Sequence, residues 1–300
     1  MFKPDYLKAG NRIRIVSPAG KVQEDKVNPA AGLLRQAGFN VVLGKHVFDI
    51  HFQFAGTDVH RMSDLQEALD DPDCKAVICS RGGYGTIRIA GGLDLTGFHR
   101  NPKWLIGFSD ITILHTLLQK YGFCSIHGAM PAFYLKEDEP TESYTELVKI
   151  LEGKRSIIQV PVHELNRAGT TEGQVTGGNL SILYSLLGTS MEPETEGKIL
   201  FIEDISEYLY HLDRMMHSLK FSGKLKNLKG LIVGGLTDMK DNLSPFGLSA
   251  EEIILNAVKE YHYPVCFNFP AGHTDHNLPL VFGADYLLSV DARKVLCRKI

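Results

Sequence analysis

Long apolar segments and a basic charge excess are both absent from this sequence. No run of about 18 apolar residues occurs, so nothing in it predicts a membrane-spanning helix. The amino-terminal residues also lack the apolar core of a signal peptide. Lys and Arg number 32 against 35 Asp and Glu, and this balance gives no electrostatic footprint for nucleic acid. We therefore expect a cytoplasmic protein whose partners include neither a membrane nor a nucleic acid.

Paired cysteines and recognisable metal motifs are absent as well. The five cysteines are scattered without C-x-x-C spacing, a pattern typical of reduced thiols rather than of a disulfide framework. The twelve histidines include no H-E-x-x-H motif. The one close pair, His273 and His276, lacks the set of carboxylate and histidine partners that a metal site needs. We expect no bound metal and no other cofactor.

The pattern of apolar runs predicts an α/β protein. Short apolar runs alternate with helical patterns in the first half, which favours a parallel sheet covered by helices on both faces. One of these helices is expected to begin near Pro29. The second half reads as a smaller mixed α/β region that ends in a meander. A polar stretch between the two halves places the domain boundary so that the domains are residues 1–160 and 161–300.

Ser109 is the most informative residue for function. It follows the apolar run 104–108 and precedes a segment whose apolar residues recur at helical spacing. A serine on a sharp turn between a strand and a helix presents its hydroxyl as a nucleophile elbow does. The residues read Gly107-Phe108-Ser109-Asp110-Ile111, without the second glycine of the usual elbow pattern. An ordinary N-cap therefore remains an alternative role for Ser109.

A nucleophilic serine needs a base, which is usually a histidine oriented by a carboxylate. His273 is the candidate base, because it lies in an irregular loop rich in Gly, Asp, Asn and Pro after a strand. The acid could be Glu203 or Asp204, which end an apolar strand. Side chains alternate faces along a strand, so only one of the two can point toward a given imidazole. The residues alone leave that choice open.

A glycine-rich loop, Arg81–Gly85, follows another predicted strand. Such a loop before a helix can hold phosphate, but this one matches neither the Walker motif nor G-x-G-x-x-G. Because ligands of parallel sheets bind at the carboxyl ends of the strands, the loop and Ser109 are both expected at that edge. Arg81 could bind a substrate carboxylate there, or could simply hold the loop.

Taken together, these motifs resemble the LD-carboxypeptidase family of serine peptidases, which includes muramoyltetrapeptide carboxypeptidases and the related microcin C immunity peptidases. The resemblance covers nearly the whole chain. The segments that carry it, in order, are 15–19, 54–61, 80–85, 106–110, 176–180, 200–204 and 271–273.

The resemblance implies a flavodoxin-like parallel-sheet N-terminal domain joined to a smaller mixed α/β C-terminal domain, with catalytic residues from both. It implies that Ser109 is the nucleophile, that His273 is the general base, and that Glu203 rather than Asp204 is the relay acid. The backbone N–H groups of Gly83 and Asp110 would form the oxyanion hole. The family often forms dimers, so a homodimer is a further expectation.

The function implied by the resemblance is release of terminal D-alanine from murein tetrapeptides during peptidoglycan recycling. One alternative is an immunity-type peptidase acting on a toxin that resembles an aminoacyl nucleotide, which would need aromatic surface to stack a base. The bridging stretch offers Phe133, Tyr134 and Tyr144 for this purpose, and the single tryptophan, Trp104, is expected in a core strand. A second alternative is a non-catalytic small-molecule-binding protein with the same fold.

Overall fold

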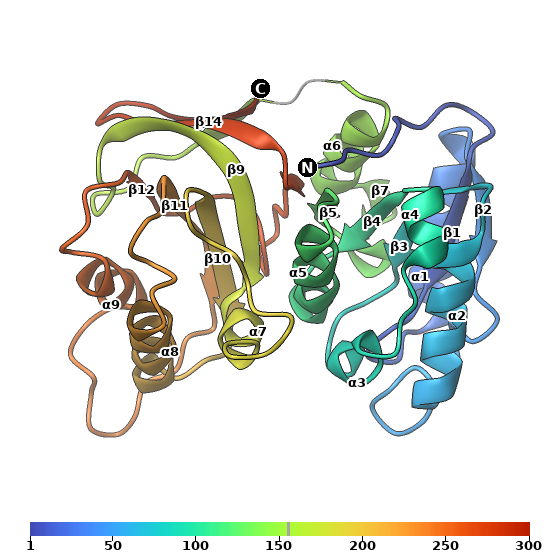
Figure 1. Cartoon of the computed structure of the whole chain (residues 1–300), viewed down its shortest axis with the longest axis horizontal. Coiled ribbons are helices and arrows are strands. Elements are labelled where there is room, and N and C mark those ends of the chain that lie inside the picture. Colours follow the sequence, from blue (N-terminus) through green and yellow to red (C-terminus); the bar gives the residue numbers. More distant parts are fainter. Residues whose placement is uncertain (155–156) are drawn as a thin grey trace. The chain divides into compact units, whose positions relative to one another are not determined.

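The computed structural model describes residues 1–154 and 157–300, which form two compact units (Figure 1). The first unit contains the residues up to 154 together with Leu278–Val281. The second contains the residues from 157 to Asn277 and Phe282–Ile300. The boundary expected after residue 160 falls at the end of a strand in the sheet of the second unit.

The first unit is built on a six-stranded sheet in the order β13-β5-β4-β3-β1-β2, as far as the described residues go. The pairs formed among β1 to β5 are all parallel, and the order 2-1-3-4-5 is that of flavodoxin-like folds. The flavodoxin-like prediction is thus confirmed. The strands are β1 (Arg12–Val16), β2 (Asn40–Leu43), β3 (Cys74–Cys79), β4 (Trp104–Gly107), β5 (Ser125–His127) and β13 (Leu280–Phe282).

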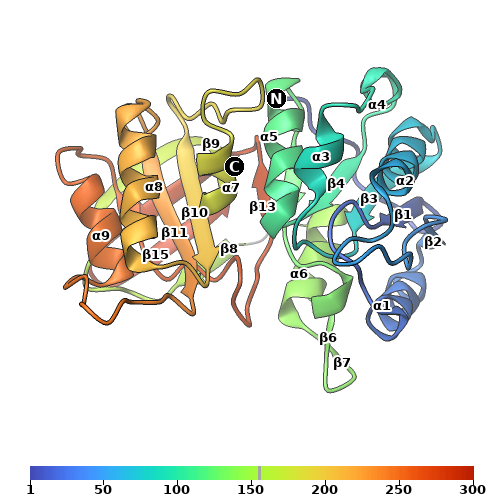
Figure 2. The ribbon, with the colours of Figure 1, turned by 90° about the horizontal axis from the view of Figure 1, so that it is seen from below.

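Helices cover both faces of this sheet. Figure 2 shows α2, α3 and α5 on one side of β1, β3 and β4, and α1 and α6 on the other. The helix expected to begin near Pro29 begins at Glu24, and Pro29 lies inside it. The prediction of where this helix starts was therefore wrong. The helices are α1 (Glu24–Gln36), α2 (Asp58–Asp70), α3 (Thr86–Ala90), α4 (Thr96–Arg100), α5 (Thr112–Lys120) and α6 (Glu142–Leu151). Short 3₁₀ turns η1 (Ser109–Ile111) and η2 (Pro131–Phe133) and a hairpin of β6 (Leu135–Lys136) and β7 (Glu139–Pro140) complete the unit.

The second unit has a mixed sheet of seven described strands in the order β12-β11-β10-β9-β14-β15-β8. The pairs from β12 to β9 are parallel, and those from β9 to β8 are antiparallel. This confirms the mixed architecture. The prediction of a terminal meander was wrong, because only β14 and β15 of the last strands are antiparallel neighbours, whereas β12 pairs in parallel with β11 and β13 lies in the sheet of the first unit. The strands are β8 (Ile157–Val160), β9 (Gly169–Asn179), β10 (Ile199–Ile205), β11 (Gly230–Thr237), β12 (Val265–Cys266), β14 (Asp285–Val290) and β15 (Val295–Lys299).

Three helices pack on the parallel part of that sheet: α7 (Leu180–Ser185), α8 (Leu209–Phe221) and α9 (Ala250–Ala257). Their apolar residues form one buried cluster with alternate residues of β10, including Leu200 and Ile202. Phe201, on the opposite face of β10, packs edge-on against the ring of Phe269. Successive side chains of β10 therefore point to different sides of the sheet, which decides where its last residues can act.

No helix in the described part of the chain is long and apolar enough to cross a membrane. All five cysteines are buried and free. Burial raises the pKa of Cys266 to about 12, so this thiol stays protonated at neutral pH.

Candidate active site

Ser109 lies in the turn that follows β4 in the first unit. Its φ angle is +63°, in the left-handed region that residues other than glycine seldom adopt. The η1 turn that begins at Ser109 leads directly into α5. Neither η1 nor α5 has a side-chain N-cap among the described residues, so the Ser109 hydroxyl does not serve as that cap. The turn has the sharp, strained backbone of a nucleophile elbow.

The glycine-rich loop after β3 lies against this turn. Strands β3 and β4 are parallel neighbours, so their carboxyl ends meet at one edge of the sheet. A Cβ atom placed on Gly82 would lie 2.8 Å from the Cβ of Ser109 and 3.0 Å from its hydroxyl oxygen. Any side chain at Gly82 would therefore displace the serine. The loop is tethered at its other side by a hydrogen bond from the Gly20 N–H to the Gly82 carbonyl, 3.0 Å long.

Two backbone N–H groups at this edge are available to an external acceptor. In the described part of the chain, neither Gly83 nor Asp110 donates its N–H to a backbone carbonyl or a side chain. Gly83 has φ +104°, a conformation that glycine adopts without strain. Asp110 follows Ser109 at the start of η1, where helical geometry leaves the first N–H groups unbonded. Such amides can stabilise an oxyanion.

The side chain of Asp110 joins the two loops, a role that the sequence analysis missed. Its Oδ2 accepts a hydrogen bond of 2.8 Å from the N–H of Thr86, the first residue of α3. The Asp110 carboxylate is almost fully buried, and burial raises its pKa despite the hydrogen bonds from Thr86. Asp110 thereby fastens the glycine-rich loop to the turn that carries Ser109. The sequence held one indication of this role: a carboxylate in a turn that is expected to be buried needs a hydrogen-bond partner.

Arg81 begins the same loop and is exposed. Its guanidinium donates a hydrogen bond of 3.0 Å to the carbonyl oxygen of Lys21. This contact supports the loop-holding role, and the exposed remainder of the guanidinium can still meet a carboxylate.

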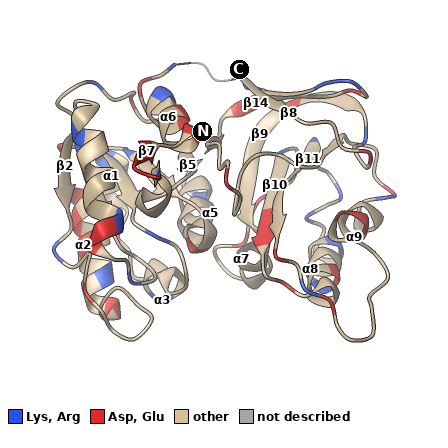
Figure 3. Cartoon of the chain, turned by 180° about the vertical axis from the view of Figure 1, so that it is seen from behind, with Lys and Arg blue, Asp and Glu red and all other residues tan. Residues whose placement is uncertain are grey.

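Glu203 and His273 form a hydrogen-bonded pair in the second unit. Glu203 lies at the carboxyl end of β10, where Figure 3 shows acidic residues, and it is fully buried. Its Oε2 lies 2.7 Å from His273 Nδ1 and accepts the His273 backbone N–H at 3.1 Å. This carboxylate thus fixes both the imidazole and the loop that carries it. The bond at Nδ1 leaves Nε2 as the nitrogen that can take a proton from a nucleophile.

Glycines allow the His273 loop to come this close. Gly272 has φ +98°, and a Cβ atom there would lie 2.6 Å from both Cγ and Oε2 of Glu203. The register of β10 with β11 shifts next to Glu203, at Gly234 and Gly235. A Cβ atom on Gly234 would meet the Ala271 carbonyl at 2.5 Å. Glycine at 272 and at 234 is therefore a steric requirement for placing the imidazole on the carboxylate.

Asp204 has a different function from its neighbour. Its Oδ1 accepts a hydrogen bond from Asn179 Nδ2 and its Oδ2 accepts one from the Ser181 N–H, at 2.9 and 2.8 Å. It therefore binds the start of α7, on the helix-covered side of the sheet. Burial and the nearby charge of Glu203 raise the pKa of Asp204 to about 7. Strand alternation thus separates the two carboxylates that the sequence left as alternatives.

The electrostatics of the pair suit a general base. Burial by itself would lower the pKa of His273, but the hydrogen bond and charge of Glu203, with the charge of Asp204, outweigh burial and raise it. His115 of the first unit differs, since burial lowers its pKa to about 4. Both nitrogens of His115 are engaged, one with the Gly107 carbonyl and one with the Ser125 hydroxyl. His115 is therefore a structural residue beneath the Ser109 turn.

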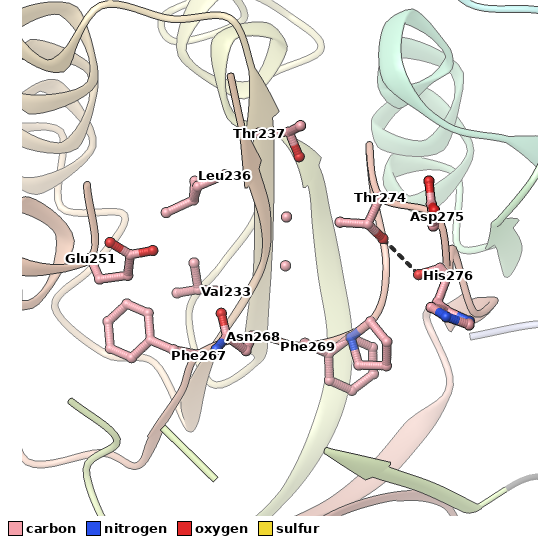
Figure 4. A pocket seen from close by; sticks show the side chains of 13 residues that line it. Val233, Leu236, Thr237, Glu251, Phe267, Asn268, Phe269, Thr274, Asp275 and His276 are labelled. Atoms are coloured by element: carbon pink, nitrogen blue, oxygen red, sulfur yellow. Dashed lines mark hydrogen bonds between the residues drawn. The ribbon is translucent and has the colours of Figure 1, made fainter. Parts of the chain in front are cut away.

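A pocket of about 420 Å³ lies within the second unit, next to the loop of His273 (Figure 4). Its walls come from the end of β11, the start of α9 and the residues just after His273. Glu251 and Asp275 line it and give it a negative character. The Thr274 hydroxyl donates a hydrogen bond of 2.7 Å to the His276 carbonyl and holds the rim of the pocket together.

The predicted site residues thus fall into two groups. The first unit holds Ser109 together with Gly83, Asp110 and Arg81, and the second holds the Glu203–His273 pair.

Comparisons with known proteins cover both units. A family model described as the LD-carboxypeptidase N-terminal domain matches residues 13–128, and one described as the LD-carboxypeptidase C-terminal domain matches residues 172–288. A probable murein peptide carboxypeptidase of Bacillus subtilis (strain 168) is 36% identical over 94% of this chain and 90% of its own length.

Solved structures give the same picture. The crystal structure of muramoyltetrapeptide carboxypeptidase from Oxalobacter formigenes matches with a TM-score of 0.87 and 30% identity, covering 96% of this chain and 98% of that one. The microcin C7 self immunity protein MccF, in complex with aspartyl sulfamoyl adenosine, matches with a TM-score of 0.86, over 99% of this chain and 98% of that one. At 23% identity, the second likeness shows a shared fold alone.

Proposed function

The chain belongs to the LD-carboxypeptidase family and is a carboxypeptidase, and we propose that it hydrolyses the amide bond that holds the terminal D-alanine of murein tetrapeptides. The observation that carries this proposal is the Glu203–His273 pair, with Nδ1 bound to the carboxylate at 2.7 Å, in a chain that also presents Ser109 on a strained turn. A serine, a histidine and a carboxylate are the groups that acyl transfer through a serine requires.

In the proposed mechanism, the Ser109 hydroxyl attacks the carbonyl carbon of the scissile amide. His273 accepts the serine proton and then gives it to the leaving amine of D-alanine. Glu203 holds the imidazole in the productive tautomer and stabilises its protonated form. The N–H groups of Gly83 and Asp110 stabilise the oxyanion of the tetrahedral intermediate. Water then attacks the ester carbonyl of the acyl-enzyme while His273 accepts its proton. His273 returns that proton to the Ser109 oxygen as the tripeptide leaves.

Recognition of the substrate's free carboxylate is proposed for Arg81. Its guanidinium is exposed beside the candidate oxyanion loop and is only partly used by the Lys21 carbonyl. A planar guanidinium can bind a carboxylate through two parallel hydrogen bonds. We further propose that the enzyme works in the cytoplasm on recycled murein peptides and that it forms a homodimer.

The experiment that tests this function is mass spectrometry of the products formed from a panel of tetrapeptides with D- or L-terminal residues. We expect free D-alanine and tripeptide from the peptide ending in D-alanine, and neither product when Ser109→Ala is used as the control for contaminating peptidases. Equal cleavage of the L-terminal peptide, or full activity of the control variant, would refute the proposal.

The immunity-type alternative is tested in the same panel with an aminoacyl sulfamoyl nucleoside. The bridging stretch offers little of the aromatic surface that such a substrate needs. Tyr134 and Tyr144 of the bridging stretch are buried, as is Trp104, while Phe133 is exposed. We therefore expect slower turnover of this compound than of the murein tetrapeptide.

A further inference from the structure

A cluster of three side chains in the first unit lies outside the candidate active site. His46 and Asp49 belong to the loop after β2, and His60 lies in the first turn of α2. Asp49 Oδ2 is 2.8 Å from His46 Nδ1 and 2.7 Å from His60 Nδ1. The two imidazole rings stack with centroids 4.0 Å apart and an interplanar angle of 20°. Two imidazole nitrogens and one carboxylate oxygen thus lie within 4.8 Å of one another.

The backbone around the cluster is shaped to permit this convergence. Gly56 has φ +81°, and a Cβ atom there would lie 2.9 Å from the Cβ of Asp49 and 3.3 Å from that of His60. A side chain at Gly56 would therefore push Asp49 and His60 apart. The His46 N–H donates a hydrogen bond of 2.7 Å to the buried carboxylate of Asp64, which fixes the loop from below. A Cβ atom on Gly44 would collide with that same carboxylate.

We propose that His46, Asp49 and His60 bind a divalent transition-metal ion of the zinc type. Two imidazole nitrogens with one carboxylate oxygen form a donor set that zinc and its neighbours favour over calcium or magnesium. Ligand atoms around a tetrahedral zinc ion are about 3.3 Å apart, given metal–nitrogen bonds of about 2.0–2.1 Å. The distances from Asp49 Oδ2 to the two Nδ1 atoms, 2.8 and 2.7 Å, need to open by only about half an ångström, which side-chain rotation supplies.

Binding of the metal ion requires no oxidant, reductant or other co-reactant. The Nδ1 protons that hydrogen-bond to Asp49 in the metal-free protein move through solvent to Nε2, so that each neutral imidazole binds the ion through the lone pair of Nδ1 while Asp49 contributes one carboxylate oxygen. The cluster is partly exposed, with the His60 side chain 42% accessible, so water can complete the coordination sphere. Such a site would fasten the loop after β2 to the start of α2.

The amino-acid sequence alone does not reveal this cluster, because metal motifs are recognised by ligands at close, regular spacing. The three residues are spread over two elements and have no standard metal-ligand spacing. The fold brings them together, and none of the three has been given a role in the candidate active site. The inference therefore does not depend on the proposed function.

The test measures metal binding to the full chain after a chelator has removed any bound ion. Calorimetry follows the binding of Zn²⁺, and visible absorption follows the binding of Co²⁺. We expect the wild type to bind one equivalent of Zn²⁺ at this cluster, with the visible Co²⁺ bands of a low-coordinate nitrogen and oxygen site. His60→Gln and Asp49→Asn should each weaken binding by at least about 100-fold, more than the loss of an outer-shell partner usually costs.

The matched control is His217→Gln. His217 lies on the surface of α8, has a similar exposure of 44%, and pairs with the single carboxylate of Asp213. This variant should bind both ions as the wild type does. The folding of every variant is checked by its thermal midpoint without metal, and D-alanine release should be unchanged in His60→Gln. Absence of Zn²⁺ binding to the wild type, or equal affinity in His60→Gln, would overturn the proposal.

Discussion

The Ser109 turn of the first unit and the Glu203–His273 pair of the second are built in different ways. The turn depends on backbone conformation: Ser109 has a left-handed φ angle, and Gly82 lies so close to it that a Cβ atom does not fit. The pair depends on side chains: one buried carboxylate oxygen accepts both the imidazole Nδ1–H and a backbone N–H. The first should therefore be sensitive to added volume and the second to removed charge.

The largest effect is expected from removing the charge of Glu203. In Glu203→Gln the neutral amide no longer enforces the productive tautomer of His273, so we expect kcat to fall by about 10⁴. Steady-state release of D-alanine measures this loss, and circular dichroism verifies that the variant is folded. A loss below tenfold would show that Glu203 does not act as the relay acid.

The same variant should change the pH dependence. His273 must be neutral to accept a proton, so kcat/KM falls as the pH drops through the pKa of His273 in the free enzyme. Glu203 raises that pKa against the effect of burial. Removing its charge should move the acid limb of the profile to lower pH, while the activity at the plateau falls. A limb that stays in place or moves to higher pH would contradict this electrostatic account.

The next effect concerns volume at the Ser109 turn. Gly82→Ala places a methyl group 2.8 Å from the Cβ of Ser109. This group must displace either the serine or the glycine-rich loop. We expect kcat to fall by about 10²–10³, the usual cost of losing one oxyanion donor. Gly91→Ala is the matched control, because nothing lies within 4 Å of the added methyl group and the glycine has ordinary helical angles. Equal activities of the two variants would refute the close-packing argument.

The smallest effect is expected at Asp110. Asp110→Ala removes the acceptor of the Thr86 N–H, so the glycine-rich loop is no longer fastened to the nucleophile turn. Misplacement of this kind should lower kcat by about 10–100-fold. Asp110→Asn keeps an acceptor oxygen and should retain most of the activity. If the alanine and asparagine variants behaved alike, the hydrogen bond would have no positioning role.

Local patterns predicted much of the fold. Alternation of strands and helices indicated a parallel sheet, and the observed order β2-β1-β3-β4-β5 confirms the flavodoxin-like prediction. The LD-carboxypeptidase resemblance is confirmed by matches to both family domains. Strand β13 was expected in the meander of the second half, but it lies beside β5 in the sheet of the first unit, because its three residues carry no local information about their pairing partner.

The candidate site also depends on contacts that local sequence patterns do not predict. Strand alternation established that Glu203 and Asp204 point to opposite sides, but only the folded position of the His273 loop shows which carboxylate meets the imidazole. The Asp110–Thr86 hydrogen bond and the His46–Asp49–His60 cluster were missed for a related reason. Each joins elements that are distant in sequence, and no residue spacing records such contacts.

We propose that Ser109 and the Glu203–His273 pair act as one catalytic unit. A double-mutant cycle on kcat for D-alanine release tests this claim most directly, using Ser109→Ala, Glu203→Gln and the combined variant. Residues that act as a unit have strongly non-additive effects, so we predict that Glu203→Gln causes no further loss once Ser109 is absent. If Glu203→Gln still lowered the rate by its full factor of about 10⁴ in the Ser109→Ala background, the two would act independently and the account would be wrong.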